Sequence, residues 1–171
     1  MKKGKLLEPT WDTGVIITDI QLENIIDKKI KGLILDIDGT LLPTKTEKLT
    51  NNVVNWVNKA KKYFKIHLCT NNPSKKRVAN IANQLDLDYT YRAYKPKRKK
   101  MQTVLINLGL ETKSTAIIGD RIFTDILCGN RSGITTILVL PINKYGQIDR
   151  NKKRFQTIEK RISRVITRFT P

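Results

Sequence analysis

Two aspartates two positions apart, Asp36 and Asp38, are the first residues whose types and spacing suggest chemistry. Alternate side chains of an extended backbone point to the same side, so these carboxylates are expected to lie close together. Like charges held close repel each other unless a cation lies between them, and Mg²⁺ prefers carboxylate oxygens. Gly39 then allows a sharp turn that would offer backbone N–H groups to an anion. A solvated turn, which Asp-Gly also favours, explains this motif equally well by itself.

Further polar residues of suitable chemistry follow along the chain. Thr70 and Asn71 supply a hydroxyl and an amide able to hold phosphate oxygens, and Lys95 supplies an ammonium. Asp120 and Asp125 supply two more carboxylates within the segment GDRIFTD. Together with Asp36 and Asp38 they form a set suited to one hard cation and one phosphoryl group.

The elements that must position these residues are short apolar runs alternating with amphipathic stretches. The runs predict five strands, at residues 32–37, 65–70, 89–94, 115–119 and 134–140. The intervening stretches predict helices after Thr50, after Pro73-Ser74, over 99–108 and over 123–130. This alternation predicts a Rossmann-like α/β fold, a five-stranded parallel sheet with helices on both faces. Ligands bind at the carboxyl ends of such strands, where all the polar residues above are found.

The order of these motifs resembles the four signature motifs of haloacid dehalogenase (HAD) superfamily phosphatases. The matching segments are DxDGT at 36–40, a strand ending in Thr70, Lys95 before a proline, and GDxxxTD at 119–125. The resemblance implies that Asp36 is the nucleophile that becomes phosphorylated and that Asp38 is the general acid and base. Thr70 and Lys95 would hold the phosphoryl group, with Lys97 as the alternative lysine.

The same resemblance implies a Mg²⁺ cofactor. Asp36, the carbonyl of Asp38 and Asp120 would bind the ion, and Asp125 would support the site. The stretches between the first three motifs are each filled by one helix and one strand, so no cap domain is expected. An open site of this kind suits a large or surface-embedded substrate.

Three further segments are similar to the YqeG-type branch of HAD subclass IIIA, which is related to phosphatidylglycerophosphate phosphatases of mitochondria and plastids. They are LLEP at 6–9, KGLILD at 31–36 and FTDILCGNR at 123–131. Gly39 departs from the branch, whose members often carry glutamate there. The resemblance implies a phospholipid phosphate as substrate, phosphatidylglycerophosphate above all, and phosphatidylglycerol synthesis as the setting. A polynucleotide end or a sugar phosphate is the alternative.

The chain is expected to divide into an N-terminal extension (1–30), a phosphatase core (31–142) and a basic amphipathic C-terminal helix (143–171). The helix carries an apolar stripe at helical spacing, formed by Phe155, Ile158, Ile162, Val165, Ile166 and Phe169. Docking of this stripe on the domain is the favoured interpretation, because amphipathic helices usually pack against a core. Peripheral contact with an anionic membrane is the alternative.

Charge, cysteine content and hydropathy bear on the binding partners and on the compartment of the protein. The formal net charge is +18, which attracts phosphate-bearing partners, although abundant Lys, Asn and Ile also fit a coding bias. A non-catalytic nucleic-acid-binding protein on a HAD scaffold is therefore a further alternative, but the basic runs, such as 95–100, lack interleaved aromatics. Cys69 and Cys128 are expected to be core thiols in a reducing compartment. No apolar run approaches the ~20 residues of a membrane span and no signal peptide is evident, so a cytoplasmic or organellar (plastid stroma or mitochondrial matrix) protein is expected, soluble or peripherally bound.

Overall fold

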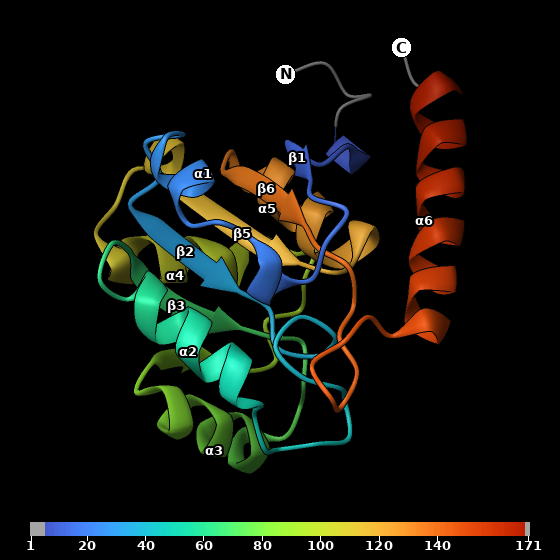
Figure 1. Ribbon diagram of the computed structural model, residues 1–171. Coiled ribbons are helices and arrows are strands. Elements are labelled where there is room, and N and C mark those ends of the chain that lie inside the picture. Colours follow the sequence, from blue (N-terminus) through green and yellow to red (C-terminus); the bar gives the residue numbers. More distant parts are fainter. Residues whose placement is uncertain (1–5, 170–171) are drawn as a thin grey trace.

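The computed structural model describes residues 6–169, and these form one parallel sheet covered by helices on both faces (Figure 1). All neighbouring strands pair in parallel, in the order β1-β6-β5-β2-β3-β4. The strands are β1 (Trp11–Asp12), β2 (Gly32–Leu35), β3 (Lys65–Cys69), β4 (Asp88–Thr90), β5 (Thr115–Gly119) and β6 (Thr135–Leu138). The α/β class and the parallel sheet are confirmed, but the sheet has six strands and not five.

The sixth strand lies within the N-terminal extension. Trp11 and Asp12 pair with Ile137 and Leu138 at the edge of the sheet. Two residues are too few to show the alternation or the apolar run by which the other strands are recognised. The segment that follows β1 is also part of the domain, because Ile17 and Ile25 are fully buried in the main core.

The third predicted strand was placed too far along the chain. The residues 89–94 were expected to be extended, but β4 ends at Thr90. Arg92 and Tyr94 have φ of 46° and 56°. Such left-handed residues interrupt an extended chain, and here they begin the loop that leads to Lys95.

The helices follow the predicted pattern more closely. They are η2 (Ile17–Asp19), α1 (Glu23–Ile26), α2 (Asn51–Ala60), α3 (Lys75–Leu85), α4 (Lys99–Leu108), η3 (Thr112–Ser114), η4 (Ile122–Ile126), α5 (Leu127–Ser132) and α6 (Arg150–Phe169). Ser74 accepts a hydrogen bond from the backbone N–H of Arg77 and so caps α3, while Gly109 ends α4 with φ of 62°. The helix expected over 123–130 begins as one turn of π-helix, η4, before it continues as α5.

Alternate residues of the central strands serve two separate cores. In β2, Leu33 and Leu35 pack with α2 and α3, whereas Ile34 packs with α4 on the opposite face. This division follows from the two-residue period of a strand, and it explains why the sequence of β2 is apolar throughout. Cys69 and Cys128 are buried as free thiols on the α4 face, as expected of core residues.

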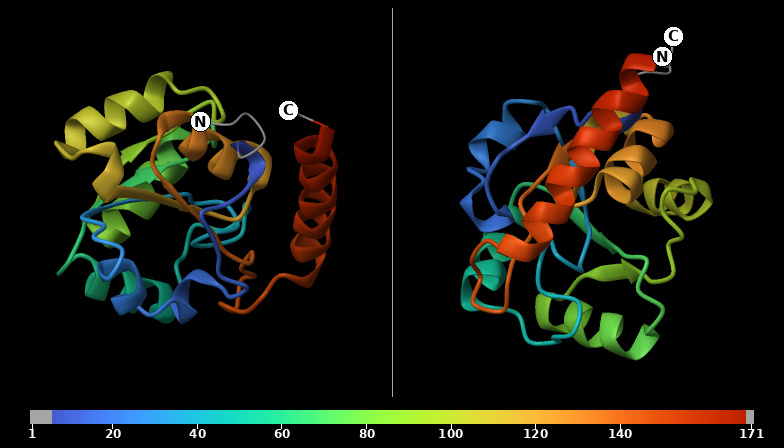
Figure 2. Two further views of the ribbon diagram at one scale, coloured as in Figure 1. Left: turned by 90° about the horizontal axis from the view of Figure 1, so that it is seen from above. Right: turned by 90° about the vertical axis from the view of Figure 1, so that its right-hand side faces the viewer.

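The C-terminal helix α6 lies beside the sheet and extends past it (Figure 2). Its polar residues Gln156, Glu159 and Ser163 are buried, whereas the apolar stripe is exposed. The expectation that the stripe docks on the domain is therefore wrong for its described members; the side chain of Phe169 lies outside the described residues, as do the residues of the basic N-terminus, 1–5. Among the described residues, no helix has the length and hydropathy needed to span a bilayer.

Candidate functional site

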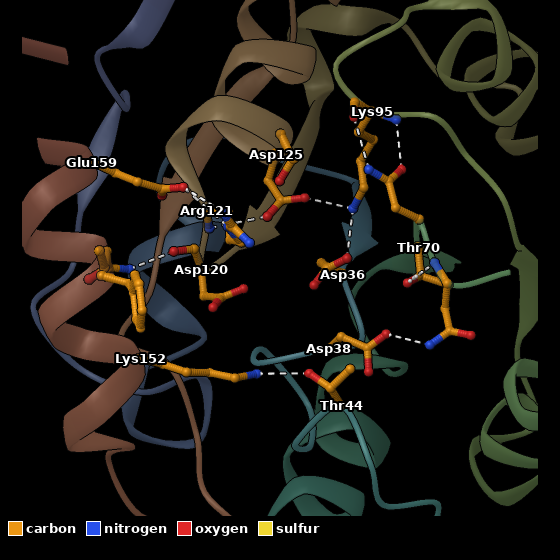
Figure 3. A pocket seen from close by; sticks show the side chains of 15 residues that line it. Asp36, Asp38, Thr44, Thr70, Lys95, Asp120, Arg121, Asp125, Lys152 and Glu159 are labelled. Carbon is orange, nitrogen blue, oxygen red and sulfur yellow. Dashed lines mark hydrogen bonds and ion pairs between the residues drawn. The ribbon is translucent and has the colours of Figure 1, made fainter. Parts of the chain in front are cut away.

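The carboxyl ends of β2, β3 and β5 bring the candidate residues to one place (Figure 3). Leu35 is level with Leu68 in β3 and with Ile118 in β5, so the residues that follow these strands share one edge of the sheet. Asp36, Asp120 and Asp125 all point there, and one ligand atom from each lies within 4.8 Å of the others. All three side chains are buried.

A single ammonium lies among these carboxylates. Lys95 Nζ is 2.7 Å from Asp36 Oδ1 and 2.6 Å from Asp125 Oδ1, and it donates a hydrogen bond to the Cys69 carbonyl at 2.7 Å. Burial alone would lower the pKa of Lys95, but the charges of Asp125 and Asp36 together raise it well above its ordinary value. Lys95 is therefore charged, whereas the alternative Lys97 is exposed and does not line the pocket.

The three acids of this cluster outnumber the single ammonium of Lys95. Burial raises the pKa of Asp36 to about 7, although the Lys95 ammonium lowers it. Burial also raises the pKa of Asp120, and the charges of Asp36 and Asp125 raise it further. If all three carboxyl groups ionise, the one ammonium leaves two negative charges, which is the charge that one divalent cation would balance.

Two further observations fit a cation at this cluster. Asp120 Oδ1 is buried and has no hydrogen-bond partner, an expensive state for a carboxylate oxygen unless a cation is bound to it. Gly39 has φ of 99°, and a Cβ at this position would lie 2.5 Å from Asp120 Oδ2. The close approach of the first motif to the fourth thus requires glycine.

The side chain of Asp38 faces away from this cluster and has its own partners. Asp38 Oδ1 lies 2.9 Å from an Arg77 guanidinium nitrogen, and Oδ2 accepts a hydrogen bond from Asn72 at 2.9 Å. Arg77 is itself fixed by hydrogen bonds to the carbonyls of Pro43 and Thr46. The carboxylate of Asp38 is therefore held at the pocket wall, and only its backbone is left as a contribution to a metal site.

The two residues expected to hold phosphate after β3 differ in what they do. Thr70 is buried beside the pocket, where its hydroxyl accepts a hydrogen bond from the Asn72 backbone N–H. The amide of Asn71 bonds with the backbone of Lys95 in both directions, at 2.9 Å and 2.7 Å. The side chain of Asn71 thus positions the backbone of Lys95, and the second N–H of its amide, at the pocket wall, is the group left for a phosphate oxygen.

The loop after β5 is held in place by α6, a role that the sequence pattern did not reveal. Gln156 donates hydrogen bonds to the carbonyls of Asp120 and Val139, both at 2.7 Å. Glu159 accepts hydrogen bonds from the Arg121 guanidinium and from the Ile122 backbone N–H. These contacts fix the backbone at Asp120 and directly after it, next to the carboxylate that lacks a partner.

One feature of the sequence could have indicated this contact. Lys152, Gln156, Glu159 and Ser163 recur at helical spacing and form a polar row beside the apolar stripe. No sequence pattern indicated the contacts of Arg77 and Asn72 with Asp38, because Asp38 lies far from both in the sequence. The basic run at 97–100 takes no part, since only Lys95 of 95–100 lines the pocket.

The acid cluster, Lys95 and Thr70 line a pocket of about 520 Å³, and α6 forms one wall of it. Lys152, Phe155, Gln156 and Glu159 line it from the helix, and Lys152 donates a hydrogen bond to the Thr44 hydroxyl at 3.1 Å across the first motif's loop (Figure 3). Lys95 and Lys152 thus place two cations in the pocket. The arrangement can bind a phosphoryl group and a divalent cation side by side.

Comparisons with known proteins agree with this geometry. Residues 93–156 match a family model described as HAD-hydrolase-like. A Bacillus subtilis (strain 168) protein named "Probable phosphatase YqeG" is 32% identical over 127 residues, which cover 74% of this chain and 73% of that protein.

Two solved structures share the fold. The cobalt-bound deoxy-D-mannose-octulosonate 8-phosphate phosphatase of Haemophilus influenzae has a TM-score of 0.53 at 14% identity, covering 66% of this chain and 70% of that one. An uncharacterized protein of Listeria monocytogenes serotype 4b has a TM-score of 0.54 at 17% identity, covering 64% and 78%.

The raised pKa values predict that protons and a divalent cation compete for the acid cluster. Asp36 has an ordinary pKa of 3.8 and a folded value of about 7. Without a cation, the free energy of unfolding should therefore fall as pH rises from about 4 to 7, because the folded state binds more protons than the unfolded chain. The stabilisation by Mg²⁺ should grow over the same range. Urea unfolding at several pH values, with Mg²⁺ or with EDTA, measures both slopes.

Asp120→Asn is the control for this competition. It keeps the shape of the side chain but removes one charge, so the Mg²⁺-dependent gain should shrink at every pH. A gain that is equal at pH 5 and pH 8 in the unmodified protein would contradict proton–cation competition.

The contact of α6 with the loop after β5 predicts a distant effect on cation binding. Gln156→Ala leaves the buried carbonyls of Asp120 and Val139 without a donor, which should cost ~1–3 kcal/mol of unfolding free energy. The apparent affinity for Mg²⁺ should fall by roughly tenfold or more, as for other residues that support a metal ligand. Thr157→Ala is the matched control, since that hydroxyl is exposed and bonds only within α6. Isothermal titration calorimetry measures the Mg²⁺ affinity of each variant. Equal affinities in Gln156→Ala and Thr157→Ala would contradict the supporting role of Gln156.

Proposed function

Because this chain belongs to the HAD superfamily of phosphatases and is a relative of YqeG within it, we propose that it hydrolyses a phosphomonoester through an aspartyl-phosphate on Asp36. The observation that carries the proposal is the buried cluster of Asp36, Asp120 and Asp125 around Lys95. We propose Mg²⁺ as the cation, bound by Asp36, Asp120 and the Asp38 carbonyl and supported by Asp125. When bound, it would neutralise the repulsion between the attacking carboxylate and the substrate phosphate.

In the first step, a carboxylate oxygen of Asp36 attacks the phosphorus and forms the aspartyl-phosphate. The bond from phosphorus to the leaving oxygen breaks, its electron pair goes to that oxygen, and Asp38 supplies the proton. Lys95 and the Thr70 hydroxyl bind the phosphoryl oxygens. Lys95 also favours the ionised form of Asp36, because its charge lowers the pKa of that carboxyl against the larger effect of burial.

In the second step, water attacks the phosphorus and Asp38 accepts its proton. The bond from phosphorus to Asp36 breaks, which releases inorganic phosphate and restores the carboxylate. Arg77 and Asn72 hold Asp38 as a carboxylate, the form that accepts the proton in this step. Asn71 orients the backbone of Lys95.

As substrate we propose a phospholipid phosphate, with phosphatidylglycerophosphate as the specific candidate. The motifs shared with the YqeG branch support this choice, because that branch resembles phosphatidylglycerophosphate phosphatases. The pocket supports it as well: Phe155 is 71% exposed and lines the pocket beside Lys152, so an apolar surface adjoins the cations. A phosphate joined to a large apolar group would contact both.

Trapping the intermediate tests the two aspartates separately. p-Nitrophenolate leaves without a proton, so Asp38→Asn should still be phosphorylated by p-nitrophenyl phosphate. The second step should slow by about 10²–10⁴-fold, because water loses its general base. Intact-protein mass spectrometry should then show a phosphorylated chain in Asp38→Asn and none in Asp36→Asn. Turnover that survives Asp36→Asn would exclude the mechanism.

A substrate panel tests the lipid assignment independently of the mechanism. We expect kcat/KM for phosphatidylglycerophosphate in mixed micelles to exceed that for a sugar phosphate and for a 5′-phosphorylated oligonucleotide by at least about tenfold, a difference of ~1.4 kcal/mol in transition-state binding. Phosphate release measures all three. Preference for either water-soluble substrate would contradict the lipid assignment and leave the phosphatase chemistry intact.

A further inference from the structure

The apolar side of α6 is exposed along the length of the helix. Phe155, Ile158, Ile162 and Val165 keep between 46% and 71% of their surface exposed. Apolar groups of this size each gain about 1.5–3 kcal/mol when they are fully buried. A contiguous exposed stripe of these four residues therefore indicates a surface that contacts something.

The domain itself does not provide that contact, because α6 docks through polar groups. Besides the bonds of Gln156 and Glu159, Lys160 Nζ lies 2.6 Å from Asp12 Oδ2. Gln156, Glu159 and Ser163 are the buried residues of the helix, at 4%, 8% and 6% exposure. With 3.6 residues per turn, the apolar stripe occupies a different side of the helix from these residues.

The remaining exposed side of α6 is strongly basic. It carries the exposed side chains of Arg150, Lys153, Arg154, Arg161, Arg164 and Arg168. The acidic residue of the helix, Glu159, is turned inward and paired with Arg121 at 2.8 Å. The outward surface of α6 within the described residues thus combines apolar groups and cations without an acidic side chain.

We propose that this surface binds an anionic phospholipid membrane, with α6 lying in the plane of the interface. Apolar side chains would enter the acyl boundary and the flanking cations would contact the headgroup phosphates. A second copy of the chain is a poor occupant, because it would bring two basic helices of chains with net charge +18 together. Nucleic acid would satisfy the cations but would leave the isoleucines in water.

The pocket lies next to the surface that we propose binds the membrane. Phe155 belongs to the exposed stripe and also lines the pocket, so the pocket adjoins the surface that would face the bilayer. A lipid phosphate could then reach Asp36 while its acyl chains stay in the membrane. This last step rests on the proposed function; the binding of α6 to the membrane does not.

Vesicle cosedimentation of the full chain tests the proposal, with vesicles of phosphatidylcholine alone or with phosphatidylglycerol added. The triple variant Ile158→Gln/Ile162→Gln/Val165→Gln removes the centre of the stripe; glutamine keeps helix propensity and charge. We expect binding to phosphatidylglycerol vesicles to fall at least about tenfold, with p-nitrophenyl phosphate turnover unchanged. Ile106→Gln is the control, since Ile106 is 76% exposed on α4, away from α6 (Figure 1).

A second variant tests the cations. Arg154→Gln/Arg161→Gln/Arg164→Gln should weaken binding and reduce its sensitivity to salt. The control is Lys59→Gln/Lys62→Gln/Lys113→Gln, which removes the same charge from exposed positions outside α6 and should leave binding unchanged. Vesicle binding that is unchanged in both α6 variants would overturn the proposal. So would a dimer of the unmodified chain in sedimentation equilibrium that the Ile/Val variant dissociates, because the stripe would then cover a second copy. Asp36→Asn should bind vesicles normally, so loss of turnover and loss of binding are separable.

Discussion

The ion pair between Lys95 and the carboxylates of Asp36 and Asp125 is the interaction on which the rest of the site depends. A charged group is costly to bury. The burial of Lys95, Asp36 and Asp125 is offset by the ion pairs that they form with one another. The balance remains incomplete, since Asp120 adds a further carboxylate with an oxygen that has no partner. Full ionisation of the cluster would therefore place an excess of negative charge at a fixed position, which a bound cation would offset before a phosphate could approach.

Such a cluster requires a rigid frame, which the parallel sheet and two close backbone approaches supply. The register of β2 with β3 and β5 sets the height of each strand end, and Gly39 lets the first loop approach Asp120. Gly119 does the same for the fourth loop, because a Cβ there would lie 2.4 Å from the Asp125 carboxyl carbon. The turn of π-helix that follows returns Asp125 to the cluster. At both glycines the backbone thus lies too close to an aspartate side chain to admit a Cβ.

The sequence predicted that the polar residues after the strands come together, because parallel strands end at a common edge of the sheet. It did not predict β1, which is two residues long, nor the end of β4 at Thr90. It also predicted the wrong side of α6. Periodicity shows that a helix has an apolar and a polar side, but the docking side depends on partners such as the Asp120 carbonyl and the Ile122 N–H, which carry no sequence signal.

A helix docked by polar groups behaves differently from one docked by an apolar stripe. Water competes for the hydrogen bonds of Gln156 and Glu159, so this contact contributes less stability than equivalent apolar burial. A ligand that binds the outward surface only when α6 is docked would therefore strengthen the contact, and with it the placement of the loop that carries Asp120. Occupation of the acid cluster by a cation would favour docking in return, because the coupling is reciprocal. The inward and outward sides of α6 thus connect the proposed membrane surface to the catalytic edge of the sheet.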